Sequence, residues 1–318
     1  MFFQTLYSPR KISRVPRVAV TRVFLFSLLV CCACLAAPVP APAALFGPGA
    51  RIVYTADTLG DVNPCRTCGG ASQGGLARRA ALLRTLAAEG NRPLILAGPD
   101  EFYSDRGEPA SARANSFTTA LHAAFSSMPY TAVYLSPAAA RDMRENNLTP
   151  MPNAVPVTDQ PVTRVFRAGN LTVACVFLPA AASPGGAPSP DQILAAQIAA
   201  KEAAKDAACV IAVSPWGIQV ENSLASSFAG YFHIVLGGGE GIAVPGQAMG
   251  DHGSPGPLWV RSDRRGRAVS VLDIISLPAP GSPWLEGINF SSRLLFLDPD
   301  MPQDETVLTI LRDLKDGE

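Results

Sequence analysis

Hydrophobic positions along this chain fall into two alternating patterns. Short, nearly continuous apolar runs are typical of strands buried on both faces, and they occupy 51–54, 93–97, 131–135, 171–178, 209–213, 233–236, 258–260 and 268–275. Between them, apolar residues recur at helical spacing over 76–89, 111–125, 139–146, 191–208 and 221–229. This alternation predicts an α/β protein, and taken alone it is typical of a doubly wound sheet.

The C-terminal part of the chain departs from this alternation. Arg264-Arg265-Gly266-Arg267 is predicted to turn an antiparallel hairpin between 258–261 and 268–275. Residues 302–313 are predicted to form a helix with Asp304 as its N-cap. The Pro- and Gly-rich stretches 180–190 and 278–283 are predicted loops. We therefore expect one domain over 45–276, followed by a linker and a C-terminal helix over 277–318.

The first 44 residues have the pattern of a signal peptide. Five bases and no acid lead into the apolar run 23–36, whose 14 residues are too few for an ordinary transmembrane helix. Ala41-Pro42-Ala43 supplies a small-x-small cleavage site, so the mature protein is expected to start near Ala44 and to be periplasmic or secreted in a bacterium. Two alternatives attach the chain to a membrane, namely lipid modification within the cysteine cluster 31–34 and retention of 23–36 as an anchor.

Composition narrows the class of protein further. Of 318 residues, 48% are hydrophobic and 16% are charged, which excludes a disordered chain and a small disulfide scaffold. The chain has 26 basic and 26 acidic residues, but five of the basic residues belong to the leader. The rest of the chain therefore has 21 basic residues against 26 acidic ones, a net charge of −5. An acidic body without a basic run argues against nucleic acid as a partner.

Chemistry-bearing residues concentrate in 52–79. The first strand leads to Asp57, and then come Cys65-Arg-Thr-Cys68, a Gly-rich stretch over 69–75, and a helix containing Arg78 and Arg79. An acid at the carboxyl end of a strand is where α/β proteins place ligand-binding groups, although Asp also suits a turn. The Gly-rich stretch could bind an anion at the helix N-terminus, but it lacks the spacing of a phosphate loop or a dinucleotide fingerprint.

This segment resembles a known family. The Asp-Thr-x-Gly start at 57–60, the Pro-Cys-x-x-Cys-Gly run at 64–69 and Gly-Gly-Leu-Ala-Arg-Arg-Ala at 74–80 are similar to the 5′-nucleotidase branch of the calcineurin-like metallophosphoesterases. More narrowly, they resemble its UshA-like (seleno)protein group, whose members carry Cys-x-x-Cys, or one selenocysteine, in this loop. The likeness is specific over 51–90 and architectural to about residue 276. It implies a single-domain, four-layer αββα sandwich rather than a doubly wound sheet.

Active members of that superfamily bind two metal ions through five strand-end motifs, and the resemblance implies where those ligands should stand. Asp57 keeps the acid of the first motif, but Leu59 stands at its His. At the second motif Pro99 replaces the Asp, and Asp100 comes one residue late. The third motif, over 133–139, has no Asn, His or acid. Asp57 and Asp100 are therefore only vestigial metal candidates.

The remaining two motifs lack their histidines. Pro215 replaces the His of the fourth motif, and Gly239 and Gly241 replace both His residues of the fifth. The chain has only three histidines, and each is expected to be structural or on the surface: His122, His233 and His252. A single weak site built from Asp57, Asp100, Asp251 and His252 is the remaining alternative. The sequence thus predicts that the two-metal centre is lost and that no cofactor is needed.

Cys65 and Cys68 remain as a candidate redox pair. In an oxidising compartment they are expected to form a disulfide, which serves either thiol exchange or as a static clip of the loop. The link to selenocysteine in relatives implies redox chemistry. A zinc site with Cys175 and Cys209 is disfavoured, because both lie in apolar runs typical of inert core thiols.

Trp216, near the fourth motif, either stacks on a ligand ring or fills the void left by a lost ligand. It joins Asp57, Arg78 and Arg79 as binding candidates in the former cleft. We expect an exported protein with a thiol redox or binding role toward an unknown periplasmic protein or small molecule. One alternative is a 5′-nucleotidase-like hydrolase of nucleotides or other phosphoesters, with an atypical divalent metal site. The other is a non-catalytic partner or binding subunit.

Overall fold

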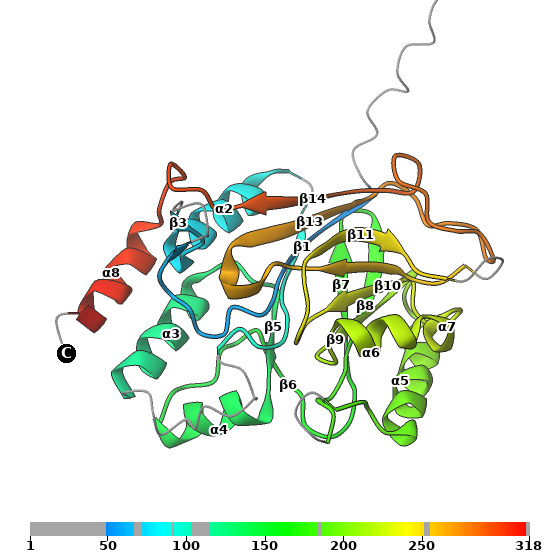
Figure 1. Cartoon of the computed structure of the whole chain (residues 1–318), viewed down its shortest axis with the longest axis horizontal. Helices are drawn as coiled ribbons and strands as arrows, with labels where there is room; N and C mark the ends of the chain where they lie inside the picture. Colours follow the sequence, from blue (N-terminus) through cyan, green and yellow to red (C-terminus); the bar gives the residue numbers. More distant parts are fainter. Residues whose placement is uncertain are drawn as a thin grey trace, which may run out of the picture. The chain divides into compact units, whose positions relative to one another are not determined.

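Two six-stranded sheets form the framework of the computed structural model, which describes residues 49–66, 72–90, 92–102, 115–182, 186–250 and 255–315 (Figure 1). These residues belong to the compact unit Gly47–Glu318. The leader 1–44, Cys68, Asp251 and His252 lie outside the described residues. Within the described ranges, no helix has both the length and the apolar character needed to cross a membrane.

The first sheet has the order β14-β13-β1-β4-β5-β6. Its strands are β1 (Ala50–Thr55), β4 (Leu94–Ala97), β5 (Ala132–Leu135), β6 (Ala154–Pro156), β13 (Ala268–Ile274) and β14 (Phe290–Phe296). β1 runs parallel to β4 and antiparallel to β13. The parallel strands β1 and β4 therefore end at the same edge, where their following loops meet.

The second sheet has the order β11-β12-β10-β9-β8-β7. Its strands are β7 (Val162–Ala168), β8 (Leu171–Phe177), β9 (Cys209–Ser214), β10 (Ile234–Gly237), β11 (Val244–Ala248) and β12 (Leu258–Arg261). The four central strands β8, β9, β10 and β12 run parallel to one another, and the edge strands β7 and β11 pair antiparallel with β8 and β12. A separate two-stranded ribbon pairs β2 (Cys65–Arg66) with β3 (Ser72–Gln73).

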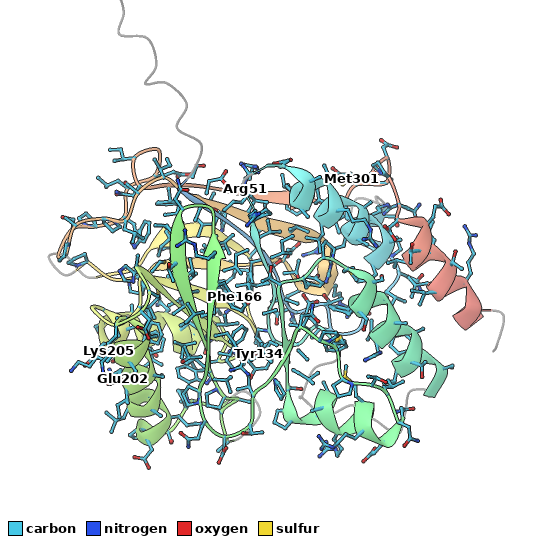
Figure 2. The ribbon with its side chains drawn as sticks, turned by 180° about the vertical axis from the view of Figure 1, so that it is seen from behind. Arg51, Tyr134, Phe166, Glu202, Lys205 and Met301 are labelled. Carbon is cyan, nitrogen blue, oxygen red and sulfur yellow. The ribbon has the colours of Figure 1, made fainter. Side chains whose placement is uncertain are left out.

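Helices cover the outer face of each sheet. The first sheet carries α2 (Leu76–Ala88), α3 (Asn115–Ser127), α4 (Pro137–Glu145) and α8 (Glu305–Lys315). The second carries α5 (Pro190–Ala203), α6 (Ile218–Ser223) and α7 (Ala225–Phe228). Leu194 and Ile198 of α5 are each 54% exposed, and just beyond the helix Lys205 forms an exposed ion pair with Glu202 (Figure 2).

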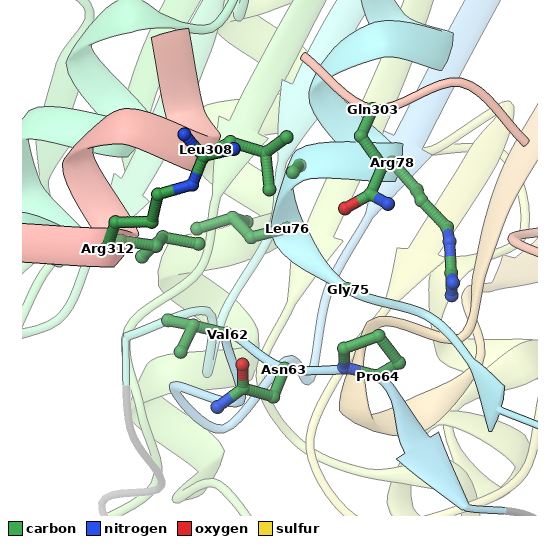
Figure 3. A pocket seen from close by; sticks show the side chains of 11 residues that line it. Val62, Asn63, Pro64, Gly75, Leu76, Arg78, Gln303, Leu308 and Arg312 are labelled. Atoms are coloured by element: carbon green, nitrogen blue, oxygen red, sulfur yellow. The ribbon is translucent and has the colours of Figure 1, made fainter. Parts of the chain in front are cut away.

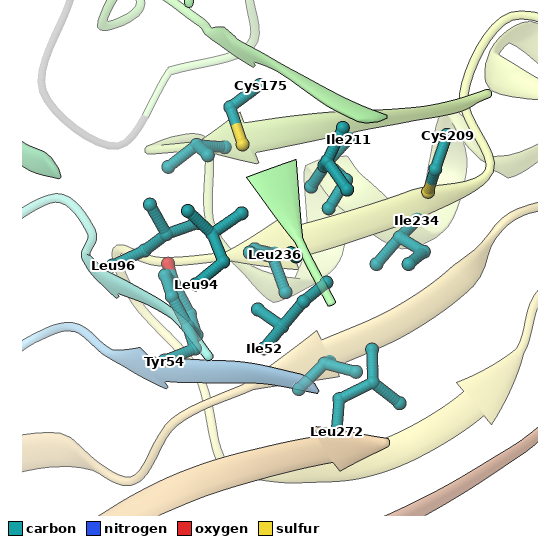
Figure 4. Packing of buried hydrophobic residues seen from close by; sticks show 14 of the residues in the cluster. Ile52, Tyr54, Leu94, Leu96, Cys175, Cys209, Ile211, Ile234, Leu236 and Leu272 are labelled. Atoms are coloured by element: carbon teal, nitrogen blue, oxygen red, sulfur yellow. The ribbon is translucent and has the colours of Figure 1, made fainter. Parts of the chain in front are cut away.

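The main core lies between the sheets. Strand alternation sends Ile52 and Tyr54 of β1 inward, where they pack with Leu236 of β10 and other inner-face residues (Figure 4). Val53, between them, faces α2 instead. Because both faces of the central strands are buried, their sequences read as continuous apolar runs. The four-layer αββα sandwich predicted from the resemblance is confirmed.

The predicted hairpin around Arg264–Gly266 is wrong. β12 and β13 lie in different sheets, and the 3-10 turn η2 (Arg264–Gly266) carries the chain from one to the other. Arg265 and Gly266 both have positive φ, 57° and 60°. The chain therefore does turn at the predicted residues. The strand that follows, β13, pairs with β1 and along the full length of β14 instead of with β12.

Residues 277–318, expected to hold a linker and a C-terminal helix, contain one more strand. β14 pairs with β13 over its full length before α8 begins. The expected N-cap of α8 is confirmed, since Val307 N donates to Asp304 Oδ1 at 3.0 Å. The segment 221–229, predicted as one helix, is divided between α6 and α7.

Candidate functional site

A buried polar cluster joins the two sheets at the carboxyl ends of β1 and β10. Asp57 stands two residues after β1 and is 1% exposed, with a φ of 56°. Its backbone N–H donates to Pro99 O at 3.0 Å, and its Oδ1 accepts from Gly239 N at 2.7 Å. The first and last strand-end motifs of the resemblance are thus in direct contact.

Arg261, the last residue of β12, reaches into this cluster from the second sheet. It is 1% exposed, and its Nη2 lies 3.8 Å from Asp57 Oδ2. Its Nη1 donates to Glu221 Oε2 in a short contact. The guanidinium also donates to the carbonyl oxygens of Gly238 (3.2 Å), Gly239 (2.9 Å), Glu240 (3.3 Å) and Ile242 (3.3 Å). One side chain therefore holds the whole loop after β10.

Glu221 of α6 is the main partner of Arg261 and is fully buried. Trp259 Nε1 donates to the same carboxylate oxygen at 2.9 Å. Burial raises the pKa of Glu221, while Arg261 and Trp259 counteract that rise. The pair resembles buried ion pairs whose stability depends on complete hydrogen bonding.

Asp57 has an unusual electrostatic environment. Burial raises its pKa well above the usual range, and the neighbouring Asp100 raises it further, although Arg261 and the Gly239 N–H act in the opposite direction. Its Oδ2 accepts no hydrogen bond within the described part of the chain. The carboxyl is therefore held beside a fixed cation rather than in a solvated cleft.

The space between the strand ends is closed by backbone contacts. Tyr54 Oη donates to Gly237 O across the sheets at 3.1 Å. Gly238 lies against the Pro99 ring, because a Cβ added there would meet Pro99 Cγ at 2.4 Å. A Cβ at Gly239, whose φ is 80°, would lie 2.7 Å from Pro215 O, and one at Gly241 would lie 2.6 Å from Ile218 Cβ. The two positions where the resemblance implies histidines thus have no room for a side chain.

A second buried ion pair lies on the first sheet's side of the cluster. Arg79 Nη1 donates to Glu101 Oε2 at 2.9 Å, and both side chains are at most 1% exposed. The hydroxyls of Thr55 and Thr58 donate to the same carboxylate in short contacts. Burial raises the pKa of the adjacent Tyr130 phenol to about 12. Arg79, proposed from sequence as a ligand-binding residue, is thus held by internal partners.

Of the other predicted site residues, Asp100 lies next to Asp57, whereas Arg78 belongs to α2 and Cys65 to β2. Asp100 has a φ of 57°, and its backbone oxygen accepts from Leu59 N at 2.8 Å. Arg78 Nη1 donates to the carbonyl oxygens of Ser72 and Gly74, both at 3.0 Å, so it holds the chain before α2. Cys65 begins β2.

Trp216 lies on the helical side of the second sheet, away from Asp57. Its ring packs 5.9 Å from the Phe228 ring, and Nε1 donates to Pro179 O at 2.7 Å. These contacts agree with the interpretation of Trp216 as a space-filling residue.

The two described histidines, His122 and His233, and the two core cysteines contact only residues of this chain. Burial lowers the pKa of His233, whose Nδ1 accepts from Val210 N at 3.1 Å. His122 Nε2 bonds Thr149 O at 2.8 Å. Cys175 and Cys209 are fully buried free thiols in the inter-sheet core, and burial raises the pKa of Cys209 to about 12 (Figure 4). Within the described ranges, no three His, Cys, Asp or Glu residues converge closely enough to hold a metal ion.

Sequence reasoning missed Arg261, Glu221 and Glu101, which form the centre of both buried pairs. A charged residue at the end of an apolar strand, as in Leu258–Arg261, is the signal that could have identified the first. Glu221 and Glu101 carry no comparable signal, since acids near helix starts and turns are usually solvated.

Comparison with solved structures identifies the architecture. The 5′-nucleotidase precursor of Thermus thermophilus superposes with a TM-score of 0.60 at 18% identity, over 84% of this chain and 58% of its own. The calcineurin-like phosphoesterase YfkN of Bacillus subtilis gives 0.56 at 15% identity, over 84% of this chain and 97% of its own. The chain has the calcineurin-like phosphoesterase fold.

Sulfate thiohydrolase SoxB of Thermus thermophilus shares this calcineurin-like phosphoesterase fold, with a TM-score of 0.61 at 14% identity over 86% of this chain and 61% of its own. The chain thus spans about three fifths of the 5′-nucleotidase precursor and of SoxB. No family model matches the sequence, and no curated protein does.

Proposed function

We propose that this chain is an exported protein with the calcineurin-like phosphoesterase fold that has lost the two-metal centre and exchanges thiols and disulfides through Cys65 and Cys68. The observation that carries the proposal is the position of Arg261. Its Nη2 lies 3.8 Å from Asp57 Oδ2, at the strand ends where the resemblance expects metal ions. A cation fixed to β12 stands beside the one acid that the first motif retains.

The residues present do not fit a two-metal centre. Such a centre needs several convergent nitrogen and oxygen ligands around two ions about 3.5–4 Å apart. Asp57 Oδ2 is a candidate ligand, but the Arg261 guanidinium faces it. Gly239 and Gly241 cannot be replaced by histidines without moving Pro215 or Ile218. No step of the proposed chemistry uses a metal.

The position of Cys65 on the β2–β3 ribbon, shortly before α2, supports the thiol chemistry. β2 starts at Cys65 and pairs with β3, and α2 follows three residues later at Leu76. A thiolate of a partner dithiol attacks the Cys65–Cys68 disulfide, forming a mixed disulfide and releasing one cysteine as a thiolate. The partner's second thiolate then breaks the mixed disulfide. The partner loses two electrons and two protons and becomes a disulfide, while Cys65 and Cys68 become a dithiol.

Phosphatase activity is tested with purified protein carrying no added metal and with Mn²⁺, Zn²⁺ or Mg²⁺ supplied. We expect less than one equivalent of bound metal and no hydrolysis of p-nitrophenyl phosphate or adenosine monophosphate. Two tightly bound metal equivalents, together with hydrolysis that disappears in Asp57→Asn, would overturn the proposal in favour of an atypical hydrolase.

Thiol exchange is tested by equilibration with reduced and oxidised glutathione. We expect Cys65→Ser and Cys68→Ser to abolish formation of an intramolecular disulfide while leaving the thermal midpoint nearly unchanged. Cys175→Ser is the matched control, because that thiol is fully buried between the sheets. A disulfide that glutathione cannot reduce, combined with a large stability loss in Cys65→Ser, would instead identify a static clip.

Export is supported by the leader pattern and not by the described residues. The basic segment, the apolar run 23–36 and Ala41-Pro42-Ala43 predict cleavage before Ala44. N-terminal sequencing of protein recovered from the periplasm tests this. A mature chain that still starts at Met1 and fractionates with membranes would favour an uncleaved anchor.

A further inference from the structure

A small pocket opens beside the start of the β2–β3 ribbon. Three segments line it: the loop 62–64, the first turn of α2, and α8 with the preceding Gln303 (Figure 3). It encloses about 80 Å³. Sites that hold a whole small molecule usually enclose about 300–1,000 Å³, so this pocket fits a single side chain.

The walls of the pocket are fixed by backbone contacts. Leu76 N donates to Val62 O at 3.0 Å, and Gly75 lies against the Pro64 ring, where a Cβ would meet Cγ at 3.0 Å. On the opposite side, Asp304 N donates to Ala77 O at 3.0 Å and ties the start of α8 to α2. The pocket is therefore preformed, and binding of a guest requires little loss of conformational entropy in the protein.

The lining is aliphatic and positively charged. Val62, Leu76, Leu308 and Leu311 supply apolar surface, Arg78 and Arg312 are the charged residues of the lining, and none of the described residues that line the pocket is a carboxylate. The N-terminus of α2 has a glycine N-cap, no side-chain cap and no acid in its first turn. Arg78 is 8% exposed, and its Nε has no hydrogen-bond acceptor within the described residues.

These features favour a guest with an apolar body and a negative end. The positive end of the 13-residue helix α2 and the exposed guanidinium of Arg312 attract a carboxylate. The aliphatic walls favour burial of a branched apolar side chain. Pro64 lines the pocket, and the following residue is Cys65. A bound polypeptide would therefore lie beside the redox ribbon.

We propose that the pocket binds a segment of a partner protein in which an aliphatic side chain stands next to an Asp or Glu. The aliphatic side chain enters between α2 and α8, and the carboxylate faces Arg312 and the N-terminus of α2. The segment is thereby held beside Cys65, which makes the pocket the recognition site of the partner dithiol. The role of the pocket in recognising a partner dithiol rests on the proposed thiol exchange. The binding of the segment to the pocket does not depend on it.

Binding is measured by fluorescence anisotropy with a labelled, end-blocked hexapeptide that contains Leu-Glu and no cysteine, so that no covalent bond to the protein forms. Replacement of the peptide's Leu by Ala, or of its Glu by Gln, is expected to weaken binding about tenfold each, because the first removes buried apolar surface and the second removes a charge-assisted contact. Arg312→Glu in the protein is expected to weaken binding of the Leu-Glu peptide at least tenfold.

Lys201→Glu is the matched control, because Lys201 is likewise exposed on the last turn of a helix, α5, which covers the other sheet. It is expected to leave peptide binding unchanged. Peptide binding that is absent, or that is insensitive to Arg312→Glu and to both peptide changes, overturns the pocket proposal. Equal weakening by Lys201→Glu identifies non-specific charge attraction and also overturns it.

A second measurement separates this inference from the proposed function. The rate of disulfide exchange is compared for glutathione and for a dithiol peptide that includes Leu-Glu. Specific peptide binding without any exchange refutes the thiol function and leaves the pocket standing. Exchange with both thiols at rates that do not depend on Leu-Glu refutes the pocket's role as recognition site.

Discussion

Removal of the Arg261 side chain is the sharpest test of how the buried cluster is held together. Arg261→Met keeps a long apolar side chain but leaves the Glu221 carboxylate without its cation, in a site where both are at most 1% exposed. It also removes donors from the carbonyl oxygens of Gly238 and Gly239. Breaking one partner of a buried pair costs about 3–5 kcal/mol, a large part of the ~5–15 kcal/mol that stabilises a typical domain.

The free energy of unfolding is measured by urea titration at 25 °C and pH 7, followed by tryptophan fluorescence. Trp259, which donates to Glu221 at 2.9 Å, reports directly on the cluster. In the double variant Arg261→Met/Glu221→Gln the unpaired charge is gone, so at least half of the loss should be recovered. The single and double variants therefore separate the charge from the shape of the side chain.

Arg293→Met is the matched control. Its guanidinium is 45% exposed and lies 3.3 Å from Asp273, so the same substitution should cost less than about 1 kcal/mol. The reasoning is refuted if Arg261→Met also costs less than about 1 kcal/mol, or if the double variant is less stable than the single one. Either result would mean that Glu221 is solvated or neutral in the folded protein.

Three further outcomes follow from the site and its neighbourhood. Burial raises the pKa of Asp57 in the folded protein above its value in the unfolded chain. Above about pH 4 the unfolded chain releases this proton while the folded protein still holds it, so the free energy of unfolding decreases as pH rises through the folded pKa. Asp57→Asn removes this loss of stability, so between pH 3 and pH 8 the urea midpoint of the variant should increasingly exceed that of the unmodified protein. Parallel profiles of the two proteins would contradict the raised pKa. Gly239→His should lower the thermal midpoint without conferring metal uptake, because its φ is 80° and its Cβ would lie 2.7 Å from Pro215 O; tight binding of Zn²⁺ measured by calorimetry would disprove this. Asp304→Ala removes the N-cap bond to Val307, and should cost about 1 kcal/mol and speed hydrogen exchange in α8, with unchanged exchange rates counting against it.

The strands that sequence predicted are those buried on both faces. β1, β8 and β9 read as apolar runs because helices cover one side and the opposite sheet covers the other. β7 and β14 were missed because they are edge strands. Val162–Ala168 places arginines between its apolar residues, and Phe290–Phe296 is only partly buried, so neither shows a run.

The candidate site was predicted in its position more than in its contents. Asp57 could be identified because a strand-end acid follows an apolar run. Arg261 and Glu221 could not be paired from sequence, since 40 residues separate them and each alone is typical of a solvated charge. The predicted hairpin failed for a related reason. A turn signal at Arg265 and Gly266 reports local backbone geometry and does not state which sheet the next strand joins.

The place of β1 in its sheet has a consequence for how the chain folds. β1 is the first described strand to be synthesised, yet it lies inside the sheet, between β4 and β13. Arg51 and Asp273 pair at 2.6 Å across β1 and β13, although they are 222 residues apart in sequence. Contacts of such long range form slowly, and this one cannot form until nearly the whole chain has been made. The growing polypeptide therefore keeps β1 unpaired on one side until β13 has been made.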